Sequence, residues 1–195
     1  CYEEVTNPSA IQFFDFPVDV AVDTGNDCAK KVELAVADKS LQGKVVLIPE
    51  IEEGLKAFNE AGFMAVLADY GQGGMQLPFV VASVCDSLFS SANAGTIAYP
   101  ALARAAANLL AVYGTEEQKR LYMQPIIDGR YYGTMCLSEP QAGSSLSDIR
   151  TSAEPAADGS YRISGAKMWI SAGDHEIGEN IVHLVLARPV GAPAG

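Results

Sequence analysis

YYGTMCLSEPQAGSSLSDIRTSAEPAADGSYRISGAKMWIS, residues 131–171, is the stretch that decides the fold of this chain. It contains two short motifs. Motif 1, MCLSEPQAGS at residues 135–144, is a β-type run that stops at Pro140 and opens into small residues. Motif 2, GAKMWIS at residues 165–171, predicts a short strand that carries the only tryptophan of the chain and ends in a hydroxyl group. The two motifs therefore predict two strands and, after the first, a loop of small residues.

Both motifs have the composition of a site for a planar, anionic cofactor. Gly143 gives the loop access to backbone angles that are closed to other residues, and Ser144 adds a small hydroxyl. Such a loop can bring its N–H groups close to phosphates or to a flat heterocycle. Trp169 and Ser171 place an aromatic face beside a hydrogen-bonding hydroxyl, which suits a polar-edged ring such as a flavin. The residues alone therefore predict binding of a planar anionic cofactor.

The chain upstream of these motifs has the pattern of helices. The first predicted helix begins near Pro49 and ends at Gly62, with apolar residues at helical spacing between them. The next apolar run predicts a second helix, whose apolar face contains Val80, Val84 and Leu88.

Two further helices are predicted before the motifs. One begins at Pro100 and ends at Gly114. Thr115–Gln118 is a capping box that opens the other, and Pro125 predicts a break near its end. Residues 49–129 are therefore expected to be all-helical.

The composition changes at Arg130. From there, runs rich in β-branched and aromatic residues alternate with turn residues, and Asp158-Gly159 is a hairpin signal. Helices followed by antiparallel strands predict an α+β fold with segregated domains. The predicted strands cover residues 131–137, 147–154, 160–165, 167–171 and 180–188.

The two motifs resemble the FAD-binding signature of acyl-CoA dehydrogenases. M-C-L-S-E-P-x-A-G-S followed by D-G-x-Y-x-I-x-G-x-K-x-W-I-S is a linked pair, which is more specific than a lone glycine-rich loop. The resemblance runs from about Lys44 to the end of the chain, and residues 1–43 do not contribute to it. Other phrases are similar to the branch that includes methylmercaptopropionyl-CoA dehydrogenases and long-chain bacterial acyl-CoA dehydrogenases.

The resemblance implies a helical domain over residues 44–130 and a β-barrel-like middle domain over residues 131–195. In the family a C-terminal helical bundle follows, so the chain is expected to stop partway through the β domain and to be part of a longer protein. Residues 1–43 are expected to be an N-terminal extension. They contain strand-like runs interrupted by Pro17 and a possible short helix that ends at Gly43, and they give no functional indication.

The resemblance also assigns cofactor contacts to motif 1. Backbone groups of Met135 and Leu137, with the Ser138 hydroxyl, are expected at the pyrimidine edge of the FAD isoalloxazine ring, where donors stabilise the charge of the reduced flavin. Gly143 and Ser144 are expected near the FAD pyrophosphate, with Ser144 also near the CoA arm of the substrate. These five residues form the first half of the predicted site.

Motif 2 supplies the second half. The resemblance places Trp169 and Ser171 beside the flavin, with the Ser171 hydroxyl near N5. Core packing is the alternative for Trp169, because that is the commoner environment of a tryptophan. The family commonly has Asp where this chain has Ser145, so a charged contact is not expected there.

The remaining polar residues of the stretch predict no catalytic base. Glu139 is expected to form hydrogen bonds within its loop, and Lys167 and Arg150 are expected to be solvated charges on strands. His175 and His183 lack the Cys or carboxylate pattern of a metal site, so no metal is predicted. Tyr99 and Met75 are expected to be packing residues.

The reaction implied by the resemblance is α,β-desaturation of an acyl-CoA thioester, as in fatty acid β-oxidation. A glutamate beyond residue 195 would remove the α-proton while the β-hydrogen leaves as hydride, and an electron-transfer flavoprotein would accept the electrons. A homodimer or homotetramer is implied, in the bacterial cytoplasm or the mitochondrial matrix. Because the chain supplies only the flavin side, it is expected to be inactive alone.

Composition excludes some functions and leaves alternatives open. The net charge of −11, from 13 basic and 24 acidic residues, disfavours nucleic acid as a partner. No run reaches the roughly 18 apolar residues that a transmembrane helix needs, and the four cysteines show no C-x-x-C spacing. The alternatives are an acyl-CoA oxidase or flavin monooxygenase of the same fold, and a non-catalytic flavoprotein that serves as a binding module.

Overall fold

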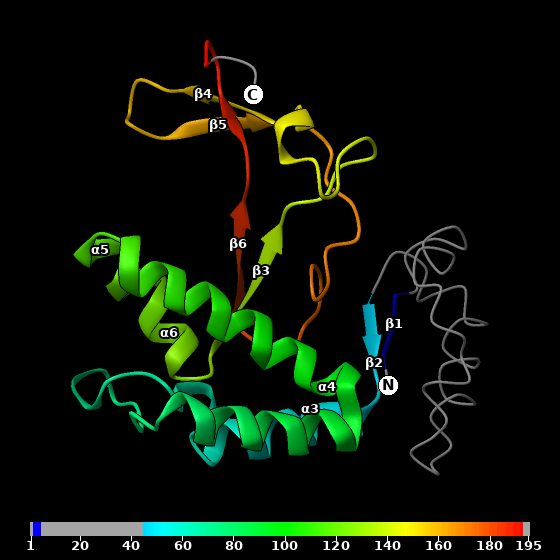
Figure 1. Cartoon of the computed structure of the whole chain (residues 1–195), viewed down its shortest axis with the longest axis vertical. Helices are drawn as coiled ribbons and strands as arrows, with labels where there is room; N and C mark the ends of the chain where they lie inside the picture. The colour runs from blue at the N-terminus through cyan, green and yellow to red at the C-terminus, as the bar shows by residue number, and fades with distance from the viewer. Residues whose placement is uncertain (1, 5–44, 193–195) are drawn as a thin grey trace.

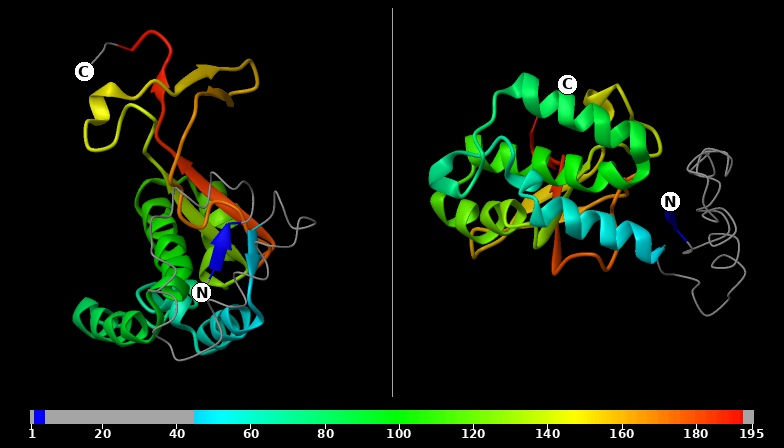
Figure 2. Two further views of the ribbon diagram at one scale, coloured as in Figure 1. Left: turned by 90° about the vertical axis from the view of Figure 1, so that its right-hand side faces the viewer. Right: turned by 90° about the horizontal axis from the view of Figure 1, so that it is seen from below.

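The computed structural model describes residues 2–4 and 45–192 of the chain. Its lower layer is helical and its upper layer contains a β-hairpin and loops, with β3 (Tyr131–Cys136) and β6 (Asn180–Val185) running between the two (Figure 1). The side view in Figure 2 also shows the β-hairpin and loops above the helices. The strand-like runs and the short helix expected within residues 5–43 lie outside the described residues.

Helix α3 (Pro49–Glu60) forms where the sequence predicts it. Pro49 occupies the first turn, where the N–H that proline lacks has no intrahelical acceptor. Gly62 follows the helix with φ 80°, a left-handed conformation that favours glycine. The buried face of the helix consists of Ile51, Leu55 and Phe58.

Helix α4 (Phe79–Tyr113) contains a kink at Asn93, and its second segment begins there. The Asn93 backbone is extended, with φ −160° and ψ 100°, and its side-chain Oδ1 accepts a hydrogen bond from the Thr96 N–H at 3.0 Å. This is the geometry of an N-cap. The expectation that the helix begins at Pro100 is therefore wrong, because the Asn93 cap starts it earlier. Gly114 follows the end of the helix as predicted.

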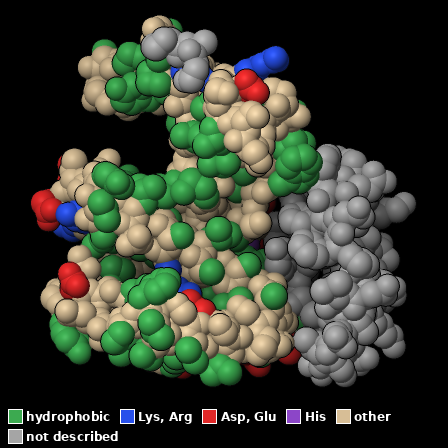
Figure 3. All heavy atoms as spheres, viewed as in Figure 1, with side chains coloured by type: hydrophobic (Ala, Val, Ile, Leu, Met, Phe, Trp, Pro, Cys, Tyr) green, Lys and Arg blue, Asp and Glu red, His purple; other side chains and the backbone are tan. Residues whose placement is uncertain are grey.

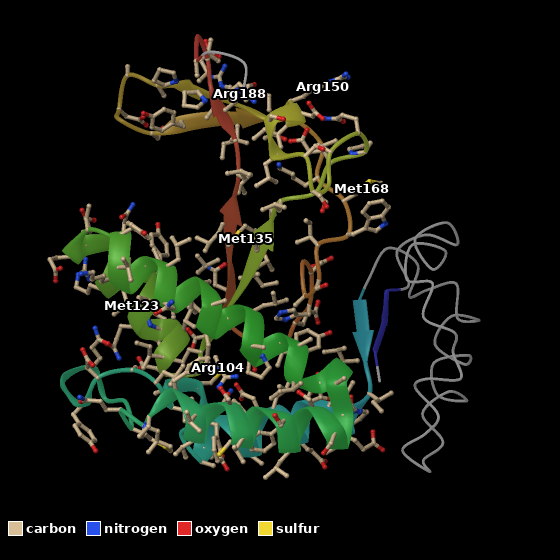
Figure 4. All side chains as sticks on the ribbon, viewed as in Figure 1. Arg104, Met123, Met135, Arg150, Met168 and Arg188 are labelled. Carbon is tan, nitrogen blue, oxygen red and sulfur yellow. The ribbon has the colours of Figure 1, made fainter. Side chains whose placement is uncertain are left out.

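An ion pair links the two segments of α4. Arg104, on the second segment, donates from Nη2 to Oδ1 of Asp86, on the first, at 2.8 Å. The Arg104 guanidinium also lies 5.8 Å from the ring centroid of Phe58 on α3. These contacts place Arg104 between α3 and the two segments of α4 (Figure 4).

The apolar face predicted for the first segment of α4 exists, but it points to the surface. Val80, Val84 and Leu88 are 72%, 55% and 66% exposed, whereas Ala82 is buried. Figure 3 shows hydrophobic side chains at the surface of the lower layer. Apolar periodicity thus predicted that this helix forms, but it did not predict which face of the helix is buried.

The predicted capping box is confirmed. The Gln118 N–H donates to Thr115 Oγ1 at 3.2 Å, and the Thr115 N–H donates to Gln118 Oε1 at 2.9 Å. The box opens α5 (Glu116–Gln118), which continues through a π-helical turn, η4 (Lys119–Met123), into α6 (Gln124–Ile127). Pro125 lies in the first turn of α6, so the predicted break is also confirmed. Among the described residues there are also three short 3-10 turns: η2 (Phe63–Ala65), η3 (Tyr70–Gln72) and η5 (Leu146–Asp148).

The described strands form three small sheets. β1 (Tyr2–Glu4) is antiparallel to β2 (Val45–Leu47), and β3 is parallel to β6. β4 (Ser152–Pro155) lies between β5 (Tyr161–Ser164), to which it is antiparallel, and β7 (Arg188–Pro189), to which it is parallel.

The chain is α+β as predicted, and the strand pattern needs three corrections. The β4–β5 hairpin turns at Asp158-Gly159 as expected, but the β3–β6 and β4–β7 pairs are parallel, so an all-antiparallel domain is wrong. The strand predicted at residues 167–171 does not form. No closed barrel is present within residues 2–4 and 45–192.

Strand β3 packs closely on α4 because both contribute small residues. A Cβ built on Gly133 would lie 2.6 Å from the Ala106 Cβ and 3.3 Å from the Ala103 Cα. Tyr132 is buried and packs edge-on against Tyr99 of α4, with ring centroids 6.3 Å apart. This contact holds the start of motif 1 on the helical layer. None of the helices in the described part of the chain is both long and apolar enough to cross a bilayer.

Candidate cofactor site

Motif 2 lies against motif 1 through two hydrogen bonds to backbone carbonyls. The Lys167 ammonium donates to the Leu137 carbonyl oxygen at 3.0 Å, and the Met168 N–H donates to the Ser138 carbonyl oxygen at 3.0 Å. The segment that carries Met168 runs beside the loop that follows β3 (Figure 4). The structure therefore brings together the two motifs that the sequence singled out.

Glu139 is the centre of this contact. Its carboxylate is buried, and Oε1 accepts hydrogen bonds from Lys167 Nζ at 2.8 Å and from the Thr151 N–H at 3.0 Å. Oε2 accepts from the Arg150 N–H and from Gln141 Nε2, both at 2.7 Å. The local hydrogen-bonding role expected for Glu139 is confirmed.

The same contacts determine the charge of Glu139. Burial raises the pKa of its carboxyl, but hydrogen bonds from Lys167, Thr151 and Arg150 outweigh burial and hold that pKa well below its ordinary value. A carboxylate this acidic is a poor proton acceptor, which agrees with its exclusion as a base. The solvated role expected for Lys167 is wrong, because its side chain is only 11% exposed and pairs with Glu139.

Strand β3 has one paired edge and one open edge. The Leu186 N–H donates to the Cys136 carbonyl at 3.1 Å, so Cys136 directs its backbone groups toward the β6 side. Neighbouring residues of a strand direct their backbone groups to opposite sides, so Met135 and Leu137 direct theirs away from β6. No strand of the described chain pairs with that edge.

The open edge offers hydrogen-bonding groups in a defined order. Along the chain it presents the Met135 N–H, the Met135 carbonyl and the Leu137 N–H, which are a donor, an acceptor and a donor. The Leu137 carbonyl is already bound by Lys167. Backbone groups need partners, and this edge is available to a ligand that can supply them.

Trp169 is exposed beside this region, and its backbone explains why motif 2 is not a strand. Trp169 has φ 58° and Ala172 has φ 55°, left-handed conformations that are uncommon for residues other than glycine and cluster at functional sites. The chain therefore turns at Trp169. The Trp169 side chain is 56% exposed, so it does not pack in the described core, and Ser171 is also exposed.

The loop of motif 1 is exposed at Gly143 and Ser144. It is closed by paired backbone hydrogen bonds between Glu139 and Ala142, at 2.7 and 3.1 Å. Gly143 does not have a positive φ, so it does not use the left-handed backbone angles that favour glycine. A Cβ at Gly143 would meet nothing within 4 Å, which leaves the loop open to a ligand.

The two histidines have structural partners. His175 is buried and packs edge-on against Tyr99 and Tyr132, each with a centroid distance of 5.1 Å, and burial lowers the pKa of its imidazole to about 4. His183 Nδ1 lies 2.7 Å from Thr134 Oγ1. In the described ranges, no three His, Cys, Asp or Glu side chains gather in a way that could hold a metal ion.

Sequence reasoning missed Lys167 as a structural partner of motif 1. Its partner Glu139 lies 28 residues earlier, and no periodic pattern reports such a pairing. One signal was present: Lys167 is a charged residue inside a motif of small and apolar residues. Such a charge, when a carboxylate occurs in the linked motif, is a candidate for a buried pair.

A family model, "Acyl-CoA dehydrogenase, N-terminal domain", matches residues 28–130. The match begins upstream of Lys44, so the expectation that residues 1–43 carry no resemblance is wrong for residues 28–43. It ends immediately before β3 begins. Motifs 1 and 2 therefore lie outside this match.

Two curated relatives and one solved structure extend the comparison. The 3-methylmercaptopropionyl-CoA dehydrogenase of Ruegeria pomeroyi is 42% identical over 153 residues, which are 78% of this chain and 26% of the relative. The broad-specificity linear acyl-CoA dehydrogenase FadE5 of Mycobacterium tuberculosis is 36% identical over 197 residues, covering 94% of this chain and 32% of the relative. A glutaryl-CoA dehydrogenase of Mycobacterium smegmatis in complex with FADH2 matches with a TM-score of 0.63 and 24% identity, over 71% of this chain and 35% of that chain. This chain thus spans between 26% and 35% of the length of these three proteins.

Proposed function

Because this chain belongs to the acyl-CoA dehydrogenase family, we propose that it forms the flavin-binding side of an FAD-dependent enzyme that desaturates acyl-CoA thioesters between the α- and β-carbons. The observation that carries the proposal is the open edge of β3, held beside motif 2 by Lys167 and Met168.

The hydrogen-bonding order of this edge suits a flavin. The pyrimidine edge of the isoalloxazine ring presents an acceptor at O4, a donor at N3 and an acceptor at O2. Met135 and Leu137 offer the complementary donor, acceptor and donor. The Ser138 hydroxyl follows directly in the chain and serves the N1 side of the same edge. The residues present therefore fit FAD.

The exposed residues of both motifs complete the proposed site. Trp169 supplies an aromatic face for the ring, and Ser171 a hydroxyl near N5. Gly143 and Ser144 receive the pyrophosphate, because their loop is exposed and there is open space beside the Gly143 backbone. Ser144 also lies at the CoA arm of the substrate.

When bound, FAD supplies the acceptor for the hydride that leaves the β-carbon. The residues of this chain hold the flavin in place and polarise it. The N–H groups of Met135 and Leu137 point at atoms on which negative charge develops, and preorganised donors of this kind stabilise such charge without reorganisation. The family resemblance implies that the α-proton goes to a glutamate outside these 195 residues. The carboxylate of motif 1 is not offered as the base, because it pairs with Lys167.

The remaining features follow from the family. Residues 44–130 form the helical part of the N-terminal domain, and residues 28–43 belong to the same domain because the family model covers them. Residues 131–195 are part of the middle domain, and residues 1–27 extend the N-terminus. The electrons pass to an electron-transfer flavoprotein, and the protein works in fatty acid β-oxidation as a homodimer or homotetramer. Its compartment is the cytoplasm in a bacterium or the mitochondrial matrix in a eukaryote.

Substitutions at Leu137 test the proposed edge. Leu137→Pro removes the N–H that points away from β6, and Leu137→Ala removes the side chain but keeps that N–H. We expect FAD titration of the natural full-length protein to show affinity about five- to tenfold weaker for the Pro variant than for the Ala variant, as for one lost hydrogen bond. Equal FAD affinities for two folded variants would contradict the assignment of this edge.

A further inference from the structure

We propose that Lys167 and Glu139 are positioning residues that set the reduction potential of the flavin bound at the open edge of β3. This inference rests on the proposed function, because it concerns the same cofactor. It adds a role for two charges that do not touch the reacting atoms in the scheme above.

The geometry places both charges at the Leu137 end of the donor edge. Lys167 Nζ is 3.0 Å from the carbonyl oxygen of Leu137, whose N–H ends that edge, and 2.8 Å from Glu139 Oε1. The side chains of Lys167 and Glu139 are 11% and 2% exposed. Charges shielded from water in this way act over short distances with little screening.

The contact with Leu137 also polarises the backbone. The Leu137 carbonyl and the Ser138 N–H belong to the same peptide unit, so an ammonium bound at the carbonyl makes that N–H a stronger donor. The Ser138 carbonyl is bound in turn by the Met168 N–H. Motif 2 thus binds the carbonyl oxygens of Leu137 and Ser138. The positive charge of Lys167 favours the negative charge that a neighbouring flavin gains when it is reduced.

The two members of the pair are expected to act with opposite signs. Removing the ammonium leaves the Glu139 carboxylate uncompensated, which disfavours a reduced, electron-rich flavin and lowers its reduction potential. Removing the carboxylate charge leaves Lys167 uncompensated and raises that potential. A role limited to holding the loop in place predicts the same direction for both changes, because each breaks the same contact.

The experiment is a redox titration of FAD in the natural full-length protein and in Lys167→Met, Glu139→Gln and the double variant. We expect the potential to fall in Lys167→Met, to rise in Glu139→Gln and to lie between these values, near that of the wild type, in the double variant. Removal of both partners of a buried pair is also tolerated better than removal of one. Lys167→Arg keeps the charge and should keep the wild-type potential.

Matched controls come from an exposed pair on α3. Lys56 Nζ lies 3.9 Å from Glu60 Oε1, with side chains 76% and 69% exposed, so Lys56→Met and Glu60→Gln make the same chemical changes in solvent. These controls should leave the potential unchanged.

The outcomes separate the inference from the proposed function. Two single variants that shift the potential in the same direction, or leave it unchanged, overturn the role of the pair while FAD binding stands. If Lys167→Met does not fold, Glu139→Gln decides alone, and a potential at or below that of the wild type overturns the role. A wild-type protein that binds no FAD overturns the proposed function and this inference together.

Discussion

Gly133 and Gly143 lie ten residues apart and illustrate two different uses of a missing side chain. At Gly133 a Cβ would collide with Ala106 of α4, so the glycine permits close packing. At Gly143 a Cβ would point into open space, so the fold itself does not require glycine there. Gly133 therefore permits the packing of β3 on α4, whereas Gly143 leaves space that a ligand can occupy.

Alanine substitutions separate these two roles. We expect Gly133→Ala to lower the free energy of unfolding by about 1–3 kcal/mol, the usual cost of overpacking a core contact. We expect Gly143→Ala to leave that free energy nearly unchanged and to weaken FAD binding. Chemical unfolding of the apoprotein measures the first effect and FAD titration the second. A Gly133→Ala protein as stable as the wild type would contradict the close packing of β3 on α4.

His175 predicts a pH dependence of stability. Burial lowers its pKa to about 4 in the folded protein, against an ordinary value of 6.5. Between pH 6.5 and 4 the unfolded state binds a proton that the folded state does not, so stability is full above this window and falls as the pH drops through it.

The measurement is the free energy of unfolding at several pH values between 4.5 and 6.5. In His175→Asn the slope in this window should be smaller than in the wild type, because the titrating group is gone. The Asn side chain can still accept the hydrogen bond that Nδ1 receives from the Ile177 N–H. An unchanged slope would mean that His175 is not held neutral in the folded state.

At the scale of elements, the kink of α4 depends on one side chain. Asn93 interrupts the helix with an extended backbone and caps the second segment through Thr96. The Arg104–Asp86 pair joins the two segments on either side of the kink. The cap determines where the second segment begins.

Removal of the cap should be measurable. Asn93→Ala is expected to cost about 1 kcal/mol of stability, the usual value for a lost N-cap, while Asn93→Asp should retain most of it. Thermal and chemical unfolding of both variants check this expectation. Equal losses in the two variants would show that the side-chain oxygen does not cap the helix.

Local signals predicted the elements that depend on nearby residues. The start of α3 at Pro49 and the capping box at Thr115 follow from contacts within one turn. The start of the second segment of α4 was misplaced because proline is a strong signal for a helix start, whereas the structure places Pro100 inside the helix, after the Asn93 cap. Motif 2 does not form the predicted strand because Trp169 has a positive φ, and because motif 2 donates hydrogen bonds to motif 1, a segment 30 residues away, that no local pattern reports.

At the candidate site, too, local signals were informative and long-range contacts were not. Motif composition predicted Trp169 beside a planar ligand, and the family resemblance predicted Met135 and Leu137 there. The structure adds an open strand edge and an exposed ring. Composition did not reveal the Lys167–Glu139 pair, because long-range pairing leaves no periodic trace. Parallel pairing of β3 with β6 was also hidden, since the two strands are separated by the hairpin and by motif 2.

At the scale of the whole molecule, this chain spans between 26% and 35% of the length of the three proteins compared above. The proposed base lies outside this chain, so we expect these residues alone to give no steady-state desaturation of acyl-CoA with an artificial electron acceptor. The natural full-length protein is the control. A sustained rate from the 195-residue chain would place the base within it.

The most direct test of the central claim is the absorption spectrum of the natural full-length protein, recorded before and after anaerobic addition of a panel of acyl-CoA thioesters. We predict flavin absorption bands that bleach with one class of acyl chain, because the substrate reduces the flavin held at β3. A protein that remains colourless and cannot be reconstituted with FAD would contradict the account. Bound flavin that no acyl-CoA bleaches would contradict the proposed reaction and leave a flavin-binding module.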